Sequence, residues 1–347
     1  MSRIQTLHKI ASPLLYKTGL YQMLWQTRAR KAPFTFVAYY HRVVEEQTVK
    51  AKSFDIERGI SASVFERQMR FLLRHFSPVK ASRAQDASNS AMQFAVTLDD
   101  GYEDNYSVAA PILKQLGIPA TFYVVSDYVG TDRLFWWEQV ANIMNRSERT
   151  ELNLTEVIPS LCKLDTHSLT MHLRNSDERD HAYGQLCAHI RKDIHANISM
   201  HMCNVADYFG VDIQDEGRHY GLMDWMQLKD LARQGFEIGC HTATHCNIIG
   251  TDEAMLKDEL INSVILLENQ LDSPIESFAY PYGLFEKSSK PVLDALAETN
   301  CRVAYTTQQG VVESESPAFE LPRAKLNRSY DFACAYNIQD TLNNTQL

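Results

Sequence analysis

Two polar segments far apart in this chain each follow directly on an apolar run that has the character of a buried strand. The run Phe94–Val96 leads into Thr97–Gly101, and the run Phe236–Gly239 leads into His241–His245. Buried parallel strands bring the residues that follow them to one rim of a sheet or barrel, where α/β enzymes usually keep their chemistry. The sequence therefore predicts an α/β fold in which these two segments meet at one rim.

The residue types in the two segments suit a metal-dependent hydrolase. Two neutral imidazoles and one carboxylate match a borderline metal such as zinc, with positions left open for water or substrate. The second carboxylate of Asp99-Asp100 would then act as a base toward the water that the metal activates. Adjacent residues on a strand point to opposite faces, so the backbone must turn at Asp100, and Gly101 permits that turn.

Three motifs in order resemble the polysaccharide deacetylase family, which is carbohydrate esterase family 4 with its NodB homology domain. Thr97–Gly101 match the family's T-F-D-D-G motif with Leu98 in place of Phe, and His241–His245 match its H-[ST]-x-x-H motif in full. Phe278–Gly283 are similar to the third motif. Further stretches resemble the bacterial exopolysaccharide branch, namely residues 40–43, 65–72 and 117–123. The resemblance covers roughly residues 34 to 328, apart from a central insertion.

The resemblance implies a role for each matching residue. It implies that three side chains hold one divalent metal ion, with zinc expected: Asp100, His241 and His245. It makes Asp99 the general base and lets Thr242 steady the second motif by hydrogen bonding. It implies that Tyr282 offers its backbone N–H to the oxyanion and places its ring near the substrate. A donor aimed at developing charge is usually a large catalytic term.

Two departures from the family pattern affect these roles. The third motif usually carries an arginine that pairs with the catalytic aspartate, but Ala279 and Tyr280 occupy that region here. Arg323, in Leu321-Pro322-Arg323, is our candidate for the replacement and is expected to pair with Asp99. No histidine follows His245, so the late L-x-H motif with its general acid is absent. We expect His41 to supply that acid, the alternative being a histidine hydrogen-bonded to a loop carbonyl.

The alternation of strands and helices predicts a deformed (β/α) barrel of the polysaccharide deacetylase type with a helical insertion. We divide the chain into residues 1–33 (N-terminal helical segment), 34–134 and 223–330 (two parts of the barrel), 135–222 (helical insertion) and 331–347 (tail). Strands are expected at 34–40, before Asp99, at 120–125, before His241, and at 277–280, 301–306 and 320–325. Helices are expected at 63–76 with Ser61 or Ser63 as N-cap, at 108–116, 166–209 and 224–234, and from Thr251 to about 271.

Composition limits the partners and the compartment. The net charge of −9 and the lack of a basic stripe argue against a nucleic-acid partner. Seven scattered cysteines without a C-x-x-C pair indicate a reducing, cytoplasmic location, and we find neither a secretory signal nor a transmembrane span. Apolar residues recur at helical spacing near the N-terminus: Ile4, Leu7, Ile10, Leu14 and Leu15. This segment packs on the domain or, as the alternative, makes peripheral contact with the inner membrane face.

Together these features predict a hydrolase that removes acetyl groups, N-acetyl before O-acetyl, from an acetylated polysaccharide or oligosaccharide intermediate. An O-acetyl esterase and a catalytically weak carbohydrate-binding relative are the alternatives. A two-His-one-carboxylate iron oxygenase is a further rival, but such sites commonly occur on all-β scaffolds. The seven histidines of the insertion show no tight ligand spacing, although a second metal site there is conceivable: His167, His172, His181, His189, His195, His201 and His219.

Overall fold

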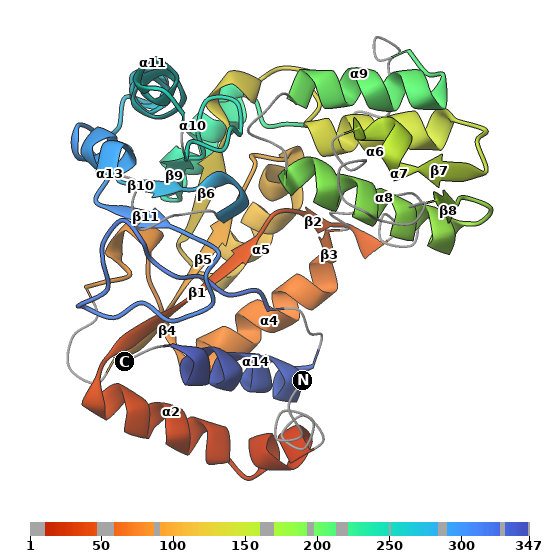
Figure 1. The fold of residues 1–347 in the computed structure, drawn as a ribbon. Coiled ribbons are helices and arrows are strands. Elements are labelled where there is room, and N and C mark those ends of the chain that lie inside the picture. Colours follow the sequence, from red (N-terminus) through yellow and green to blue (C-terminus); the bar gives the residue numbers. More distant parts are fainter. Residues whose placement is uncertain are drawn as a thin grey trace. The chain divides into compact units, whose positions relative to one another are not determined.

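The computed structural model describes two compact units, and Figure 1 shows their elements. It describes residues 11–46, 59–86, 91–159, 170–192, 198–212, 221–249, 251–283, 290–326 and 330–345. The first, which we call the barrel unit, contains the described residues of 1–46, 59–131 and 222–347. The second, which we call the inserted unit, contains the described residues of 132–221. The barrel unit carries both predicted motifs.

The barrel unit is built on a parallel sheet in the order β1-β5-β6-β9-β10-β11, with β4 beside β5. The strands are β1 (Phe34–Tyr40), β4 (Ser77–Pro78), β5 (Met92–Leu98), β6 (Ala120–Val124), β9 (Glu237–Cys240), β10 (Ser277–Ala279) and β11 (Val303–Tyr305). Leu321 bridges to Tyr305 of β11 and Ala324 bridges to Ala38 of β1, so this segment connects the two edges. The strand predicted at 320–325 is wrong as a strand, because Pro322 lacks the N–H that a continuous ladder requires.

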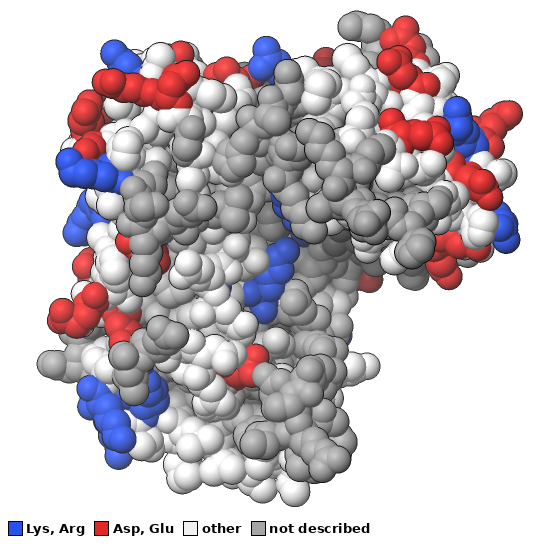
Figure 2. Space-filling view, viewed as in Figure 1, with Lys and Arg blue, Asp and Glu red and all other residues white. Residues whose placement is uncertain are grey.

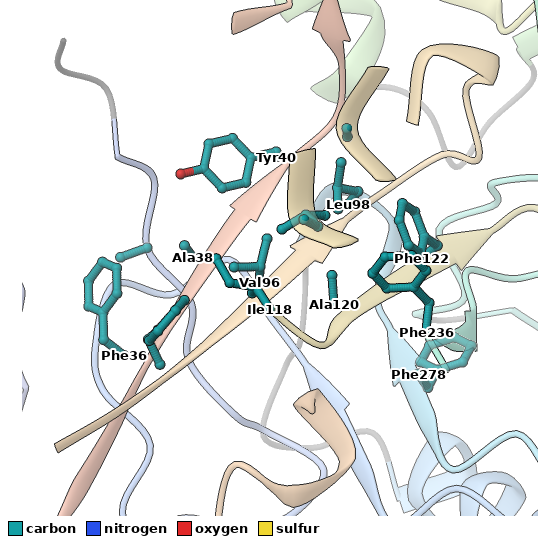
Figure 3. Close-up of a cluster of buried hydrophobic side chains, with 14 of the residues drawn as sticks. Phe36, Ala38, Tyr40, Val96, Leu98, Ile118, Ala120, Phe122, Phe236 and Phe278 are labelled. Carbon is teal, nitrogen blue, oxygen red and sulfur yellow. The ribbon is translucent and has the colours of Figure 1, made fainter. Parts of the chain in front are cut away.

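Alternate strand residues face opposite sides of the sheet, and both sides are buried. One side packs under the helices, and its residues include Phe36, Val96, Phe122 and Phe278, all fully buried (Figure 3). The other side fills the barrel with Val37, Ala95, Tyr123, Ala279 and Tyr305. The Tyr123 ring leaves no room for a side chain at Gly239 of β9, because a Cβ there would lie 2.3 Å from the ring. The barrel interior is therefore a packed core rather than a channel.

Helices cover the barrel unit. They are α2 (Leu20–Lys31), α4 (Ala62–His75), α5 (Ala110–Leu116), α10 (Trp225–Arg233), α11 (Glu253–Leu256), α12 (Ser263–Leu271), α13 (Lys290–Ala297) and α14 (Asp331–Asn344). Two π-helical turns, η2 (Asn105–Ala109) and η5 (Lys257–Asn262), precede α5 and α12. Short elements complete the unit: β2 (Val43–Val44), β3 (Ile60–Ser61), and the 3₁₀ turns η1 (Ala81–Arg83), η3 (Ser126–Tyr128) and η6 (Pro281–Gly283).

Of two helix N-caps predicted from the sequence, one is confirmed and the other is wrong. The Ser61 side chain accepts a hydrogen bond from the backbone N–H of Val64, which confirms the predicted cap of α4. The cap predicted at Thr251 is wrong, because Asp252 accepts from the N–H of Met255 and starts α11. Thr251 instead donates its hydroxyl to the carbonyl of Ile248.

The inserted unit is mainly helical, as predicted. Its helices are α6 (Trp136–Arg146), α7 (Leu154–Val157), α8 (Ser176–Lys192) and α9 (Ile198–Phe209). Residues 170–172 were expected in a helix, but β8 (Thr170–His172) pairs antiparallel with β7 (Glu151–Asn153). The strand pairing buries Leu152 against the unit and overrides the weak helical pattern. Among the described residues no second group of metal-ligating side chains occurs there; His167, His195 and His219 lie outside them.

The described part of the N-terminal segment packs on the barrel unit. Ser12 donates to the carbonyl of Phe332 in α14, and the rings of Tyr16 and Trp25 contact His75 of α4. Ile4, Leu7 and Ile10 lie outside the described residues. Within the described ranges, none of the helices has the length and apolar character needed to cross a membrane.

Candidate active site

Strand alternation aims three predicted site residues at the inside of one rim of the barrel. His41 follows β1, Asp99 follows β5 and His241 follows β9, each at the carboxyl end of its strand. Each continues the inward set of its strand, as in the series Ala95, Thr97, Asp99. The N–H of Asp99 donates to Tyr40 O at 2.9 Å, and that of His241 donates to Val124 O at 3.0 Å. Ladder hydrogen bonding thus extends to the first site residue on both strands.

The turn after β5 brings both aspartates inward. Asp100 has φ 76° and Gly101 has φ 79°, so the backbone is left-handed at the residue where the sequence predicts a turn. Asp99 and Asp100 are each 2% exposed. Aspartate is one of the few non-glycine residues that adopt this conformation readily, which makes the turn possible at this position.

The three predicted metal ligands lie together and suit one ion. Asp100 Oδ1 is 3.5 Å from His241 Nε2 and 3.3 Å from His245 Nε2. Ligands about 2.0–2.2 Å from one tetrahedral zinc ion would lie roughly 3.3–3.6 Å apart, which matches both distances. Asp100 Oδ1 is buried and has no hydrogen-bond partner within the described part of the chain. An acceptor in that position fits a cation.

Backbone carbonyls and the Glu259 carboxylate hold the histidine loop, residues 241–245, in place. His241 Nδ1 donates to the carbonyl of Ala279 at 2.6 Å, which leaves Nε2 toward Asp100. Glu259 of η5 accepts from Thr244 twice, from its N–H at 2.9 Å and from its hydroxyl at 2.5 Å. The backbone oxygen of Glu259 also accepts from the N–H of Ala243 at 3.0 Å.

The Thr242 side chain does not make the expected hydrogen bond, although its backbone carbonyl accepts from the N–H of Ser126 at 3.1 Å. The Thr242 hydroxyl is buried and has no hydrogen-bond partner within the described residues. Its backbone is left-handed, with φ 65°. Thr244 supplies the predicted hydroxyl hydrogen bond instead, two residues later.

Arg323 forms the ion pair that the sequence predicts. Its Nη1 and Nη2 atoms donate to Asp99 Oδ1 and Oδ2 at 2.8 and 2.9 Å. Arg323 also donates to Thr97 Oγ1 and to the carbonyl of Thr306, both at 3.0 Å, and it is fully buried. A bidentate pair fixes the plane of the carboxylate as well as its charge.

The charges in the site keep both aspartates ionised. Burial alone raises the pKa of Asp99, but Arg323 and then His241 outweigh it, and the pKa is lowered. Burial likewise opposes ionisation of Asp100, yet the adjacent imidazoles of His241 and His245 hold its pKa well below the usual range. His41 is also among the groups that lower the pKa of both carboxyls, so its imidazole is within electrostatic reach of the site.

Two residues that the sequence analysis did not select support the His41 segment. The Asn105 side chain donates to the carbonyl of His41 at 2.8 Å. Asp104 accepts from Arg42 Nε at 2.7 Å and from the N–H of Val43 at 3.3 Å. Both follow the first motif closely in the sequence, within Asp99-Asp100-Gly101-Tyr102-Glu103-Asp104-Asn105, so their proximity was a usable clue. Nothing in the sequence around Glu259 marks it.

Tyr282 lies beside the histidine loop. Its ring centroid is 4.7 Å from that of His245, with the rings nearly perpendicular at 83°. Its φ of 61° is again left-handed. Five described non-glycine residues have positive φ, and four of them belong to this site: Asp100, Thr242, His245 and Tyr282. Such clustering of strained backbone is typical of functional sites.

Comparison with known proteins identifies the family and the fold. A family model described as polysaccharide deacetylase matches residues 86–304, more than half of the chain. A Bacillus subtilis (strain 168) protein, provisionally named the polysaccharide deacetylase YxkH, is 20% identical over 269 residues; the match covers 76% of this chain but only 64% of that relative. IcaB from Ammonifex degensii is similar in structure, with a TM-score of 0.54 and 16% identity over 88% of this chain and 97% of its own. The Streptococcus pyogenes deacetylase PplD, solved with acetate, has a TM-score of 0.52 and 16% identity over 90% and 99%. These structures confirm the predicted barrel fold.

Proposed function

Because the chain belongs to the polysaccharide deacetylase family, a family of hydrolases, we propose that it removes acetyl groups from an acetylated glycan. N-acetyl groups are the first candidate. The observation that carries the proposal is the pairing of two buried carboxylates with different partners. Asp99 is held by Arg323, while Asp100 faces two imidazoles. Adjacent acids with distinct surroundings are suited to distinct tasks.

We assign the ion to Asp100, His241 and His245 and expect zinc. When bound, the ion supplies Lewis-acid chemistry that polarises the acetyl oxygen and lowers the pKa of water. Asp99 takes the proton of the attacking water, with the carboxylate plane fixed by Arg323. The backbone N–H of Tyr282 stabilises the oxyanion. His41 gives a proton to the departing nitrogen or oxygen, since an unprotonated amine leaves poorly.

We place this reaction in the cytoplasm, on a lipid-linked or soluble biosynthetic intermediate rather than finished cell wall. The support is chemical, because the described cysteines are free thiols: Cys187, Cys203, Cys240, Cys246, Cys301 and Cys334. Free thiols persist in reducing compartments. Acetylated exopolysaccharide precursors are the corresponding substrate class.

The test is acetate release from a panel of N-acetylated and O-acetylated oligosaccharides, with Asp99→Asn as the inactive control. Release from amino-sugar oligomers, lost in the control, supports the proposal. Release from O-acetyl sugars alone makes the protein an esterase. Glycan binding without acetate release from any member, at full metal loading, would identify a carbohydrate-binding relative and contradict the proposal.

A further inference from the structure

The N-terminal helices carry a basic and apolar face that does not take part in the proposed reaction. No aspartate or glutamate occurs before Glu45, although the whole chain has a net charge of −9. Residues 11–33 contain four basic residues, Lys17, Arg28, Arg30 and Lys31. A local reversal of charge on an acidic protein suggests a partner that is itself acidic.

Two N-terminal helical stretches, residues 11–17 and α2, pack their inner residues against the same part of the barrel unit. Tyr16 and Trp25 contact His75 of α4, and Tyr21 donates to Ser12, which bonds α14. Buried residues recur every four positions along α2, at Tyr21, Trp25 and Ala29. The opposite sides of both stretches therefore face away from the barrel.

Large apolar side chains occupy that outer side. Leu14 is 66% exposed, Met23 is 56% exposed and Leu24 is 40% exposed. On α2, the exposed basic residues Arg30 and Lys31 follow Met23 and Leu24 by seven residues, about two helical turns, so the four lie along one side of the helix. Figure 2 shows lysine and arginine atoms at one end of α2 beside an uncharged surface, with no acidic atoms over the helix.

We propose that this outer face, formed by Leu14, Lys17, Met23, Leu24, Arg30 and Lys31, binds the surface of an anionic phospholipid bilayer. Exposed leucine and methionine would enter the headgroup region, and the ammonium and guanidinium groups would pair with lipid phosphates. The charge pattern selects a bilayer over a second copy of the chain, because two copies of this face would repel each other. Arg28 is left out because it pairs with Glu313.

Vesicle co-flotation tests the proposal without using activity. The full chain is mixed with phosphatidylcholine vesicles, or with vesicles containing about 30 mol% phosphatidylglycerol, at about 0.1 M salt. We expect binding to the anionic vesicles only, and loss of binding at about 1 M salt because charge attraction is then screened. Absence of binding to anionic vesicles would overturn the proposal.

Matched variants separate this face from general charge effects. Arg30→Glu with Lys31→Glu should lower partitioning by roughly ten-fold or more, and Met23→Ser with Leu24→Ser by several-fold. The controls are Lys114→Glu with Arg233→Glu, which make the same charge change on α5 and α10, and Met226→Ser, whose side chain is 77% exposed. Equal losses in the controls would refute a specific face. A change in molecular mass on light scattering with Met23→Ser and Leu24→Ser would make it a protein interface instead. Thermal unfolding of each variant verifies that it is folded.

Discussion

The aspartate turn after β5 and the histidine loop after β9 reach the same rim but are held in different ways. Asp99 is fixed through its side chain, by two charge-assisted hydrogen bonds from the buried Arg323. The histidine loop is held at several residues. The backbone N–H of Thr244 donates to the Glu259 carboxylate, and the His241 ring donates to the carbonyl of Ala279. Asp99 is thus held by one ion pair, whereas the histidine loop is held by several neutral and charged contacts.

This difference separates the two tasks of the site. A base needs its carboxylate plane held against the attacking water, which a bidentate guanidinium provides. Metal ligands need several donors oriented at once, which a loop pinned at successive residues provides. Substitutions of Asp99 or Arg323 should therefore affect turnover, and substitutions in the histidine loop should affect metal content.

The largest effect should come from His241→Ala, which removes a proposed ligand. We expect the wild-type chain to bind about one zinc ion and this variant to bind almost none, with activity lost. Elemental analysis after dialysis measures the content, and added zinc should raise the unfolding temperature of the wild type only. Full metal retention in the variant would remove His241 from the ligand set.

Asp99→Asn should leave the metal in place and lower turnover. A positioned base typically contributes roughly 10²–10⁴-fold, so a loss in that range is expected at wild-type zinc content. Steady-state acetate release and elemental analysis on the same sample give the two quantities. Asp294→Asn, on the exposed side of α13, serves as the control. Unchanged turnover would assign Asp99 another role.

His41→Ala tests whether His41 is a general acid or a positioning residue. A general acid is needed far more for an amide than for an ester with a good leaving group, so the loss should be roughly 10²-fold for the amide and small for the ester. Equal losses would indicate positioning, and no loss would exclude His41. His181→Ala, on the exposed side of α8, is the matched control.

Glu259→Gln should have the smallest effect and a distinct signature. A glutamine can no longer accept from both the N–H and the hydroxyl of Thr244 with a full charge, so the loop should loosen. We expect about ten-fold weaker zinc affinity, and near-normal turnover once zinc is saturating. Competition with a chelating dye measures the affinity, and Glu253→Gln on the neighbouring α11 is the control. A turnover defect that zinc cannot restore would contradict the division of tasks.

Much of this site could be predicted from the sequence because strand alternation fixes where a residue points. The positions of His41, Asp99 and His241 follow from three apolar runs and a period of two. The pairing of Arg323 with Asp99 could be predicted because the third motif lacks the arginine that usually pairs with the catalytic aspartate. Glu259 could not be found, because its role depends on a π-helical turn packing behind a loop, which no local pattern encodes. The left-handed backbone of Thr242 was not predicted either, and the hydroxyl hydrogen bond expected there is made by Thr244.

The residues of the barrel unit on either side of the inserted segment are hydrogen-bonded to each other, which bears on how freely that segment can vary in length. Gly130 donates to Met223 O at 3.0 Å, and Met223 donates to Gly101 O at 2.9 Å. β6 and β9 pair directly, and α10 lies between them in the sequence, so the connection between these two parallel strands has its own helix outside residues 132–221. A change in the length of residues 132–221 therefore need not alter the register of β6 and β9, because the pairing of the flanking residues and of the strands does not depend on that segment.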